Sequence, residues 1–274
     1  MKAILKKTLP LPLLNFLRAI HDWEENFFSR AIRAWRDLSV FMSFLCNRGL
    51  NTSLRNRLRV AKQLCLISSA IESPHTQEEM LTYIKTILLL PRNCRGVVVE
   101  AGCYKGSSTA KFSLATDIVG RELVVFDSFK GIPDNDEPHT MDIFGNSANF
   151  KRGYYCGTLD EVKRNIAKYG KIACCRFIEG WFEDTMPHFQ QLISAIYLDV
   201  DLASSTRTCL KHLYPLLEPG GVIFSQDGHL PLIINVVNDD NFWLNEIGCK
   251  KPKILGLGKS KLIKIIKKSG SPRE

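Results

Sequence analysis

The amino-acid sequence predicts a doubly wound α/β domain whose seven-stranded sheet contains one antiparallel strand. Two observations lead to this prediction. Five apolar segments rich in β-branched residues alternate with predicted helices between residues 97 and 247, which is typical of parallel βα units. Residues 252–266 then contain two short apolar segments around a Gly-containing turn, which predicts a terminal hairpin.

The predicted elements follow one another in a regular order. Thr76 and Glu79 have the spacing of a capping box, and Pro91 ends the helix that this box begins. Thr158 and Glu161 repeat the capping pattern. The predicted strands cover residues 97–100, 122–127, 174–178, 195–199 and 222–227, and the helices between and after them cover residues 107–116, 158–169, 205–217 and 231–247.

One connection in this pattern is unusually long. Residues 128–157 are rich in Gly, Pro, Asp and Asn and contain no predicted helix or strand. Loops of this length in compact domains are usually functional. We therefore expect this segment to be a lid or a substrate-binding loop.

The basic charge of the chain lies at its two ends. Residues 1–60 contain eleven Lys and Arg against four Asp and Glu, and residues 250–274 contain nine against one. The total is +9 and the ends contribute +7 and +8, so the residues between them carry −6. The basic pI therefore does not describe the centre of the fold, and nucleic acid is not an expected partner.

Residues 1–60 are predicted to form a basic amphipathic helical extension to a domain at residues 61–274. Aromatic side chains are interspersed with arginines between residues 14 and 45. Such a helical region could lie on a membrane interface or pack on a partner chain. Packing on its own domain or on a second copy of the chain, which would give a homo-oligomer, is the other possibility.

The composition favours a cytoplasmic protein, with peripheral membrane contact as an alternative. No segment reaches about 18 uninterrupted apolar residues, the length that predicts a membrane-spanning helix. The nine cysteines are odd in number and form no Cys-x-x-Cys pair. They fit reduced thiols better than a disulfide framework or a zinc site.

Acidic residues stand at or just after the carboxyl ends of all five predicted parallel strands. Ligands of doubly wound sheets bind beyond these strand ends, so the five acids are candidate site residues. A single acid there is often only a helix cap, but capping does not readily explain five. The acids are Glu100, Asp127, Glu179, Asp199 (followed by Asp201) and Asp227.

Three of the strand ends have further features of a nucleotide site. Glu100 and Gly102 begin a turn with a second glycine at Gly106, where the backbone can approach a ligand closely. Glu100 favours a cofactor with an amine or a ribose over a bare phosphate. Asp127 follows Gly102 by 25 residues, close to the spacing of an acid that binds ribose hydroxyls. Trp181 and Phe182 could stack on a purine, or could belong to the core.

Asp199 and Asp227 follow strands that are expected to be neighbours. Their carboxylates could converge on one hard cation, with Asp201 or the Gln226 carbonyl as a further oxygen ligand. The alternative is that they line a cofactor pocket without a metal.

Together these segments resemble the class I S-adenosylmethionine-dependent methyltransferases, and more narrowly the macrocin O-methyltransferase (TylF/MycF-like) family. The resemblance covers roughly residues 95–230. The matching strings are Val-Glu-Ala-Gly-Cys-Tyr-Lys-Gly-Ser-Ser (99–108), Val-Phe-Asp-Ser-Phe-Lys-Gly-Ile-Pro-Asp (125–134), Gly-Thr-Leu-Asp-Glu-Val (157–162), Glu-Gly-Trp-Phe-Glu-Asp-Thr-Met-Pro (179–187), Leu-Asp-Val-Asp-Leu-x-x-Ser-Thr (198–206) and Leu-Tyr-Pro-Leu-Leu-Glu-Pro-Gly-Gly (213–221).

The resemblance implies a Rossmann-like methyltransferase sheet, S-adenosyl-L-methionine as cofactor and Mg²⁺ as a helper of methyl transfer to a hydroxyl. The implied metal ligands are Asp199, Gln226 and Asp227. The catalytic candidates are Asp199 and two possible bases, His139 and His229. The implied cofactor-binding residues are Glu100, Gly102, Tyr104, Gly106, Ser107, Ser108, Asp127, Ser128, Glu179, Gly180, Trp181, Phe182 and Asp199.

At the implied metal site, this sequence departs from the family pattern at one position. The family usually has an acidic pair after the fifth strand, where this chain has Gln226 and Asp227. An amide in place of a carboxylate removes one unit of ligand charge. This leaves a weaker metal site, a shifted site that uses Asp201 or His229, or metal-free chemistry with a histidine base.

The predicted function is that of an O-methyltransferase acting on a hydroxylated small molecule, such as a sugar or another glycosylated natural product, with Mg²⁺ assistance. The alternative is a non-catalytic or metal-independent S-adenosylmethionine-binding protein. In that case the basic N-terminal helices would attach it to a membrane or a partner.

Overall fold

The computed structural model describes residues 36–50, 52–91 and 93–268 of the chain. The chain divides into two compact units, Met1–Cys46 and Asn47–Glu274. In the first unit, residues 36–45 are helical. Most of the predicted extension lies outside the described residues, so its boundary at residue 60 and its contacts stay predictions.

The second unit contains the predicted seven-stranded sheet, in the order β3-β2-β1-β4-β5-β7-β6. Five neighbouring strands are parallel, and β7 runs antiparallel to both β5 and β6. The sheet therefore has the one antiparallel strand that the sequence predicts. The strands are β1 (Val97–Ala101), β2 (Leu123–Asp127), β3 (Cys175–Glu179), β4 (Ile193–Leu198), β5 (Leu217–Ser225), β6 (Ile254–Leu255) and β7 (Ile263–Ile266).

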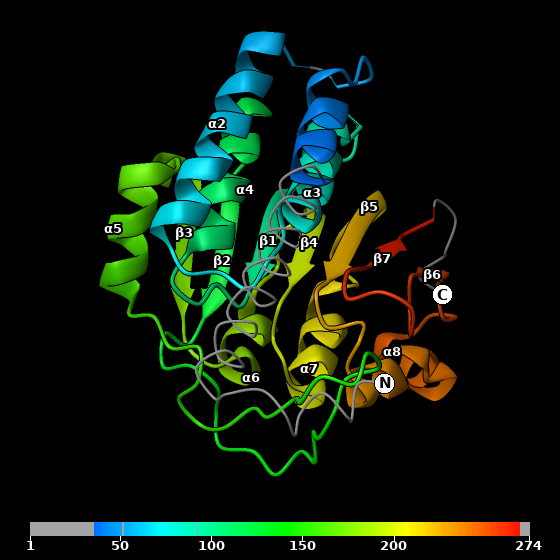
Figure 1. Ribbon diagram of the computed structural model, residues 1–274. Helices are drawn as coiled ribbons and strands as arrows, with labels where there is room; N and C mark the ends of the chain where they lie inside the picture. The colour runs from blue at the N-terminus through cyan, green and yellow to red at the C-terminus, as the bar shows by residue number, and fades with distance from the viewer. Residues whose placement is uncertain (1–35, 51, 92, 269–274) are drawn as a thin grey trace, which may run out of the picture. The chain divides into compact units, whose positions relative to one another are not determined.

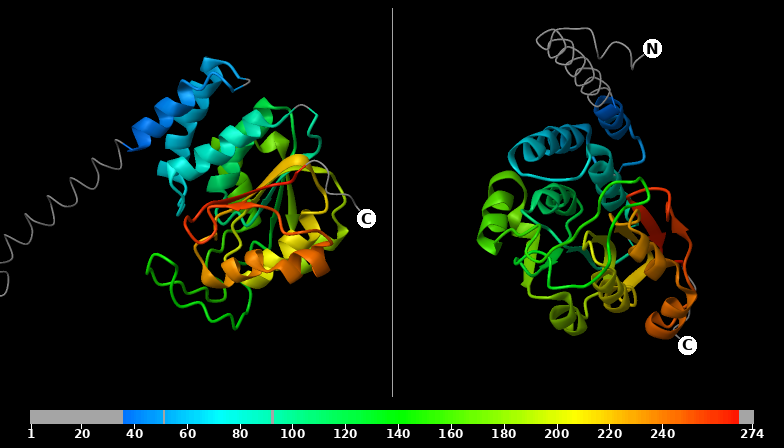
Figure 2. Two further views of the ribbon diagram at one scale, coloured as in Figure 1. Left: turned by 90° about the vertical axis from the view of Figure 1, so that its right-hand side faces the viewer. Right: turned by 60° about the horizontal axis from the view of Figure 1, so that its bottom comes forward.

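Helices cover both faces of this sheet (Figures 1 and 2). Helix α4 packs against α2, α3 and α5 on one face, and α7 packs against α6 and α8 on the other. The helices are α2 (Leu54–Ala70), α3 (Gln77–Leu89), α4 (Ser107–Ile118), α5 (Leu159–Tyr169), α6 (Phe182–Thr185), α7 (Ala203–Leu213) and α8 (Pro231–Asn238), with short helical turns at η2 (Ile172–Cys174), η3 (Met186–His188) and η4 (Phe242–Ile247).

The strand order creates a switch point beside β1. The chain builds β1, β2 and β3 outward in one direction, and then returns to place β4 and β5 on the other side of β1. The helices that follow the two sets of strands leave in opposite directions, which opens a crevice beyond the carboxyl ends of the strands. The fold thus positions the strand-end acids around one space.

Local sequence explains where several helices begin. Thr76 and Glu79 form the predicted capping box, each side chain accepting a hydrogen bond from the other's backbone amide. Thr158 accepts from the amide of Glu161 at the start of α5. Such caps stabilise a helix by about 1 kcal/mol each.

Two predicted helices are shorter than expected. The helix predicted over residues 205–217 ends at Leu213. Tyr214 still has helical backbone angles, but Pro215 has no amide to donate the next helical hydrogen bond. Strand β5 already begins at Leu217. Its pairing with β4 shifts register between Leu217 and Val222, which accommodates the Pro-Gly-Gly segment within the strand. The helix predicted over residues 231–247 is interrupted after Asn238, and a separate helical turn, η4, follows it.

The long connection at residues 128–157 has no helix or regular strand, apart from an isolated bridge between Met141 and Ser147. Its Glu137 carboxylate accepts the backbone amides of Ala203 and Ser204, at distances of 2.7 and 2.8 Å. The loop therefore caps the start of α7 and is fastened to the fold. Among the described helices, none is both long and apolar enough to cross a membrane.

Candidate active site

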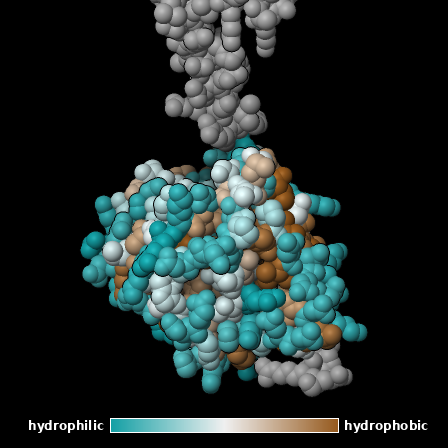
Figure 3. All heavy atoms as spheres, turned by 90° about the horizontal axis from the view of Figure 1, so that it is seen from below, coloured by the Kyte–Doolittle hydropathy of each residue, from teal (hydrophilic) through white to brown (hydrophobic). Residues whose placement is uncertain are grey.

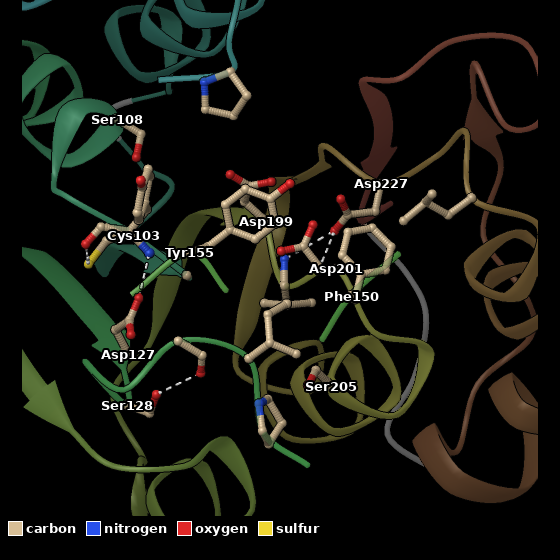
Figure 4. Close-up of a pocket in the computed structure, with 18 of the residues that line it drawn as sticks. Cys103, Ser108, Asp127, Ser128, Phe150, Tyr155, Asp199, Asp201, Ser205 and Asp227 are labelled. Atoms are coloured by element: carbon tan, nitrogen blue, oxygen red, sulfur yellow. Dashed lines mark hydrogen bonds between the residues drawn. The ribbon is translucent and has the colours of Figure 1, made fainter. Parts of the chain in front are cut away.

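A cavity of about 340 Å³ lies at the carboxyl ends of the parallel strands. Figure 3 views the molecule from this side, where apolar side chains interrupt a mainly hydrophilic surface. The close-up in Figure 4 shows Asp127 and Ser128 toward one end of the cavity, and Asp201 and Asp227 toward the other. The long loop contributes to its wall through Phe150 and Tyr155.

The glycine turn after β1 is shaped by close backbone contact. A Cβ atom at Gly102, whose φ is 82°, would lie 2.0 Å from the carbonyl oxygen of Asp199. Gly106, with φ 81°, is the N-cap of α4, and no side chain caps this helix among the described residues. Ser107 and Ser108 line the cavity at this uncapped N-terminus, which favours an anionic group such as a carboxylate.

Asp127 fastens this turn to the end of β2. Its carboxylate accepts the amide of Cys103 at 2.7 Å and the amide of Phe129 at 2.7 Å. Burial raises the pKa of Asp127, and these backbone hydrogen bonds counteract part of that rise. Asp127 lines the cavity. Each of its carboxylate oxygens has a further lone pair and can still accept a hydrogen bond from a ligand hydroxyl.

Glu100 lies behind the turn, is fully buried and does not itself line the cavity. Neither of its carboxylate oxygens has a hydrogen-bond partner within the described part of the chain. Burial raises its pKa to about 8, and the nearby hydroxyls of Ser108 and Thr109 offset this only in part. A buried acid without a partner is costly in its ionised form, and a cationic amine placed beside it would remove that cost.

The segment after β3 provides the apolar part of the cavity. Gly180, Trp181 and Phe182 line it, and the amide of Gly180 donates to the carbonyl oxygen of Asp127 at 3.0 Å. Glu179 is exposed and does not line the cavity, whereas Glu183 does. The aromatic side chains predicted to stack on a purine, Trp181 and Phe182, therefore do line the cavity, but the acid that lines it beside them is Glu183 and not Glu179.

Three carboxylates converge at the ends of β4 and β5. One oxygen each of Asp199, Asp201 and Asp227 lies within 4.8 Å of the other two. Asp227 also accepts the amides of Val200 and Asp201, at 3.1 and 3.2 Å. Burial and then the charge of Asp199 raise the pKa of Asp227 to about 7. Three oxygens this close are a donor set for a hard divalent cation.

The third member of this group is Asp201, one of the two further oxygen donors that the sequence left open, and the Gln226 side chain lies elsewhere. Gln226 is fully buried, does not line the cavity, and accepts a hydrogen bond from the Tyr197 hydroxyl at 2.9 Å. Burial and neighbouring charges raise the pKa of Asp201 well above its ordinary value. Of the arrangements that the sequence left open, the geometry favours the shifted site.

His75 is a site residue that the sequence analysis missed. Its Nε2 atom lies 2.8 Å from Oδ2 of Asp199, and its Nδ1 atom lies 3.1 Å from the Ser73 hydroxyl. Burial opposes ionisation of Asp199, but the charge and hydrogen bond of His75 outweigh it, so the pKa of Asp199 lies below its ordinary value. His75 stands directly before the capping box of α3, and nothing in its local sequence indicates this contact.

The two predicted histidine bases lie in different places. His139 does not line the cavity, and its Nε2 atom lies 2.9 Å from the Glu137 carboxylate that caps α7. His229 does line the cavity, and its Nε2 atom lies 3.9 Å from Oδ2 of Asp142. Burial and then the charge of Lys261, a further cavity residue that the sequence analysis missed, lower the pKa of His229.

Comparisons with known proteins agree with this architecture. A family model described as macrocin-O-methyltransferase (TylF) matches residues 79–240. Mycinamicin III 3''-O-methyltransferase of Micromonospora griseorubida is 35% identical over 152 residues, which are 53% of this chain and 59% of that protein. A tetracenomycin-C rhamnosyl 4'-O-methyltransferase of Streptomyces olivaceus is 31% identical over 150 residues, 53% of this chain and 57% of that protein. The matches thus span just over half the length of these relatives.

Solved structures share the fold over a larger part of the chain. The O-methyltransferase NovP superposes with a TM-score of 0.62 at 21% identity, covering 78% of this chain and 100% of that one. The calicheamicin methyltransferase CalS11 superposes with a TM-score of 0.55 at 17% identity, covering 80% and 95%. At these identities the likeness supports the fold alone.

Proposed function

The chain belongs to the macrocin-O-methyltransferase (TylF) family, and on that premise we propose that it transfers the methyl group of S-adenosyl-L-methionine to a hydroxyl of a sugar or glycosylated small molecule. The observation that supports this most directly is the convergence of Asp127, Asp199, Asp201 and Asp227 on one cavity beside the glycine turn. The name of the Streptomyces olivaceus relative contains a rhamnosyl group, which favours a sugar as acceptor.

The residues of the cavity fit the three chemical parts of this cofactor. The uncapped N-terminus of α4 suits the methionine carboxylate. The unpartnered carboxylate of Glu100, buried directly behind the glycine turn, suits an amine bound at that turn. Asp127 has spare lone pairs for the ribose hydroxyls. The aromatic Trp181 and Phe182 suit the adenine ring. When bound, the cofactor supplies a sulfonium methyl group that a positioned oxygen can attack.

A divalent cation also fits. Asp227 is buried and Asp199 and Asp201 are half-buried, and burial and then mutual repulsion raise the pKa of Asp201 and of Asp227. A cation would relieve this repulsion. Bound Mg²⁺ would lower the pKa of an acceptor hydroxyl.

The remaining chemistry is assigned to side chains of this chain. His75 orients Asp199 through the 2.8 Å hydrogen bond. His229 lines the cavity beside the acids, and we assign to its imidazole the acceptance of the hydroxyl proton. His139 lies outside the cavity and is left with its structural contact to Glu137. The wall formed by Phe150 and Tyr155 limits water access to the reacting atoms.

Calorimetric titration with S-adenosyl-L-methionine, with and without Mg²⁺, tests the proposal. Saturable binding followed by turnover on glycosylated acceptors is the expected result. Absence of cofactor binding would contradict the enzyme assignment, and turnover that is unchanged by chelation would contradict the metal role. Binding without any turnover would favour the non-catalytic alternative.

The N-terminal extension is proposed to serve as a membrane or subunit contact. Its support is the sequence alone, namely eleven basic against four acidic residues in residues 1–60. Comparing the full chain with a chain lacking residues 1–45, by light scattering and by vesicle sedimentation, tests the two roles separately.

A further inference from the structure

The long loop exposes three apolar side chains close to the cavity. Met141 is 58% exposed, Phe144 56% and Ile143 39%. Residues 141–146, which we call the loop tip, are closed by the bridge between Met141 and Ser147. Single exposed apolar residues are common, but three within four positions indicate a binding surface.

The backbone of the loop tip is already hydrogen-bonded. Asp142 accepts the amides of Phe144 and Asn146 through Oδ1, at 2.9 and 2.8 Å, and its own amide donates to the carbonyl of Asn146. The amide of Gly145 donates to the carbonyl of Asp142, and that of Ile143 donates to the carbonyl of His229. The loop tip can therefore enter an apolar medium without leaving these five donors unpaired.

A lysine-rich turn lies next to the loop tip. The amide of Ile143 donates to the carbonyl of His229. Gly228, which precedes His229, donates its own amide to the carbonyl of Lys261 in this turn, at 2.9 Å. The two segments thus attach to neighbouring residues, the loop tip to His229 and the hairpin turn to Gly228 (the green loop and the orange-red hairpin in Figure 2). Lys259 in this turn is exposed, and residues 250–268 contain eight lysines and no acid.

The carboxylate nearest the loop tip is engaged by hydrogen bonds within the tip. The Asp142 carboxylate accepts the amides that close the tip and lies 3.9 Å from His229. Asp134, elsewhere in the same loop, pairs with Arg152 at 2.6 Å. An approaching surface would therefore meet the three apolar side chains of the tip and the exposed Lys259 of the neighbouring turn.

We propose that the loop tip and the hairpin turn at residues 256–262 form a docking surface for an anionic phospholipid membrane. Apolar insertion and lysine attraction are each weak alone, and their combination gives stable peripheral binding. His229, which binds the loop tip, and Lys261, which belongs to the hairpin turn, both line the cavity, so a docked membrane would face the mouth of the candidate active site. This inference does not depend on the proposed methyl transfer.

Vesicle sedimentation of the full chain tests the proposal. The wild-type protein is expected to bind vesicles of phosphatidylglycerol and phosphatidylcholine and to bind pure phosphatidylcholine much more weakly. The double variant Met141→Ser/Ile143→Ser is expected to lose at least about tenfold in partitioning, because two apolar side chains no longer enter the lipid. Lys259→Glu is expected to weaken binding to the anionic vesicles alone.

The matched control is Leu192→Ser. Leu192 is 43% exposed but precedes β4, at the end of the sheet opposite the cavity, so its replacement is expected to leave partitioning unchanged. The proposal is overturned if the wild type does not bind anionic vesicles, or if the double variant binds them as well as the wild type does. The second result would assign the binding to another segment, such as residues 1–60. Cofactor titration on the same samples reports separately on the proposed function.

Discussion

Replacing Glu100 with Gln is expected to remove a pH-dependent cost from the fold. Glu100 is fully buried without a hydrogen-bond partner among the described residues. Its pKa rises from an ordinary 4.5 to about 8, so the folded state binds more protons than the unfolded state between these values. Stability contributed by this group is therefore present at low pH and is lost as the pH rises through this window.

The size of the effect follows from the shift. At about 1.36 kcal/mol per pKa unit, holding Glu100 in the fold at pH 7 costs about 3 kcal/mol relative to pH 4.5. Urea unfolding of the cofactor-free protein at pH 5, 6, 7 and 8 measures this cost. The free energy of unfolding of the wild type is expected to fall relative to that of Glu100→Gln by about 1 kcal/mol per pH unit.

A control separates this group from the other acids. Glu78→Gln changes an exposed glutamate on α3 and is expected to follow the wild type at every pH. Parallel curves for the wild type and Glu100→Gln would refute the reasoning, because they would mean that Glu100 ionises in the fold without penalty. If the Glu100 carboxylate pairs with the cofactor's amine, the same variant should also bind S-adenosyl-L-methionine at least about tenfold more weakly, which is about 1.4 kcal/mol.

Three further predictions concern the cavity. Gly102→Ala should lower the free energy of unfolding by about 3 kcal/mol in chemical denaturation, because its Cβ would overlap the carbonyl oxygen of Asp199; a loss below 1 kcal/mol would mean that the turn relaxes easily. Mg²⁺ should raise the melting temperature of the wild type, and Asp201→Asn should abolish this rise; an equal rise in both would exclude Asp201 as a ligand. His229→Ala should lower kcat at least about 100-fold, whereas His139→Ala should mainly lower thermal stability. Steady-state assays in which His139→Ala loses kcat and His229→Ala keeps it would exchange the two roles.

Much of the fold could be predicted because its signals are local. The capping box at Thr76 and Glu79 was found in sequence and is present in the structure, since both partners lie within one helical turn. The order of strands and helices followed from apolar segments that alternate with helices. The helix α7 ends at Leu213, before the predicted end at residue 217, because Leu217, which continues the apolar pattern beyond Pro215, already belongs to β5.

The candidate site could be predicted only in part. Placing an acid at each strand end requires only the strand positions and the rule that parallel strands end at one edge. Gln226 and Asp227 could not be told apart in this way. Both residues lie in the turn that follows β5, where the alternation of a strand no longer predicts which side chain faces the cavity. Here the amide contacts Tyr197 and the carboxylate lines the cavity.

The sequence by itself determined the α/β fold, the glycine turn and the acids around it, because each depends on neighbours in the chain. Only the tertiary structure brought His75 to Asp199, two residues 124 positions apart. It also joined Asp201 to the other two carboxylates and kept His139 out of the cavity. Such contacts depend on how α3, the sheet and the long loop pack together, and no local pattern of residues specifies that packing.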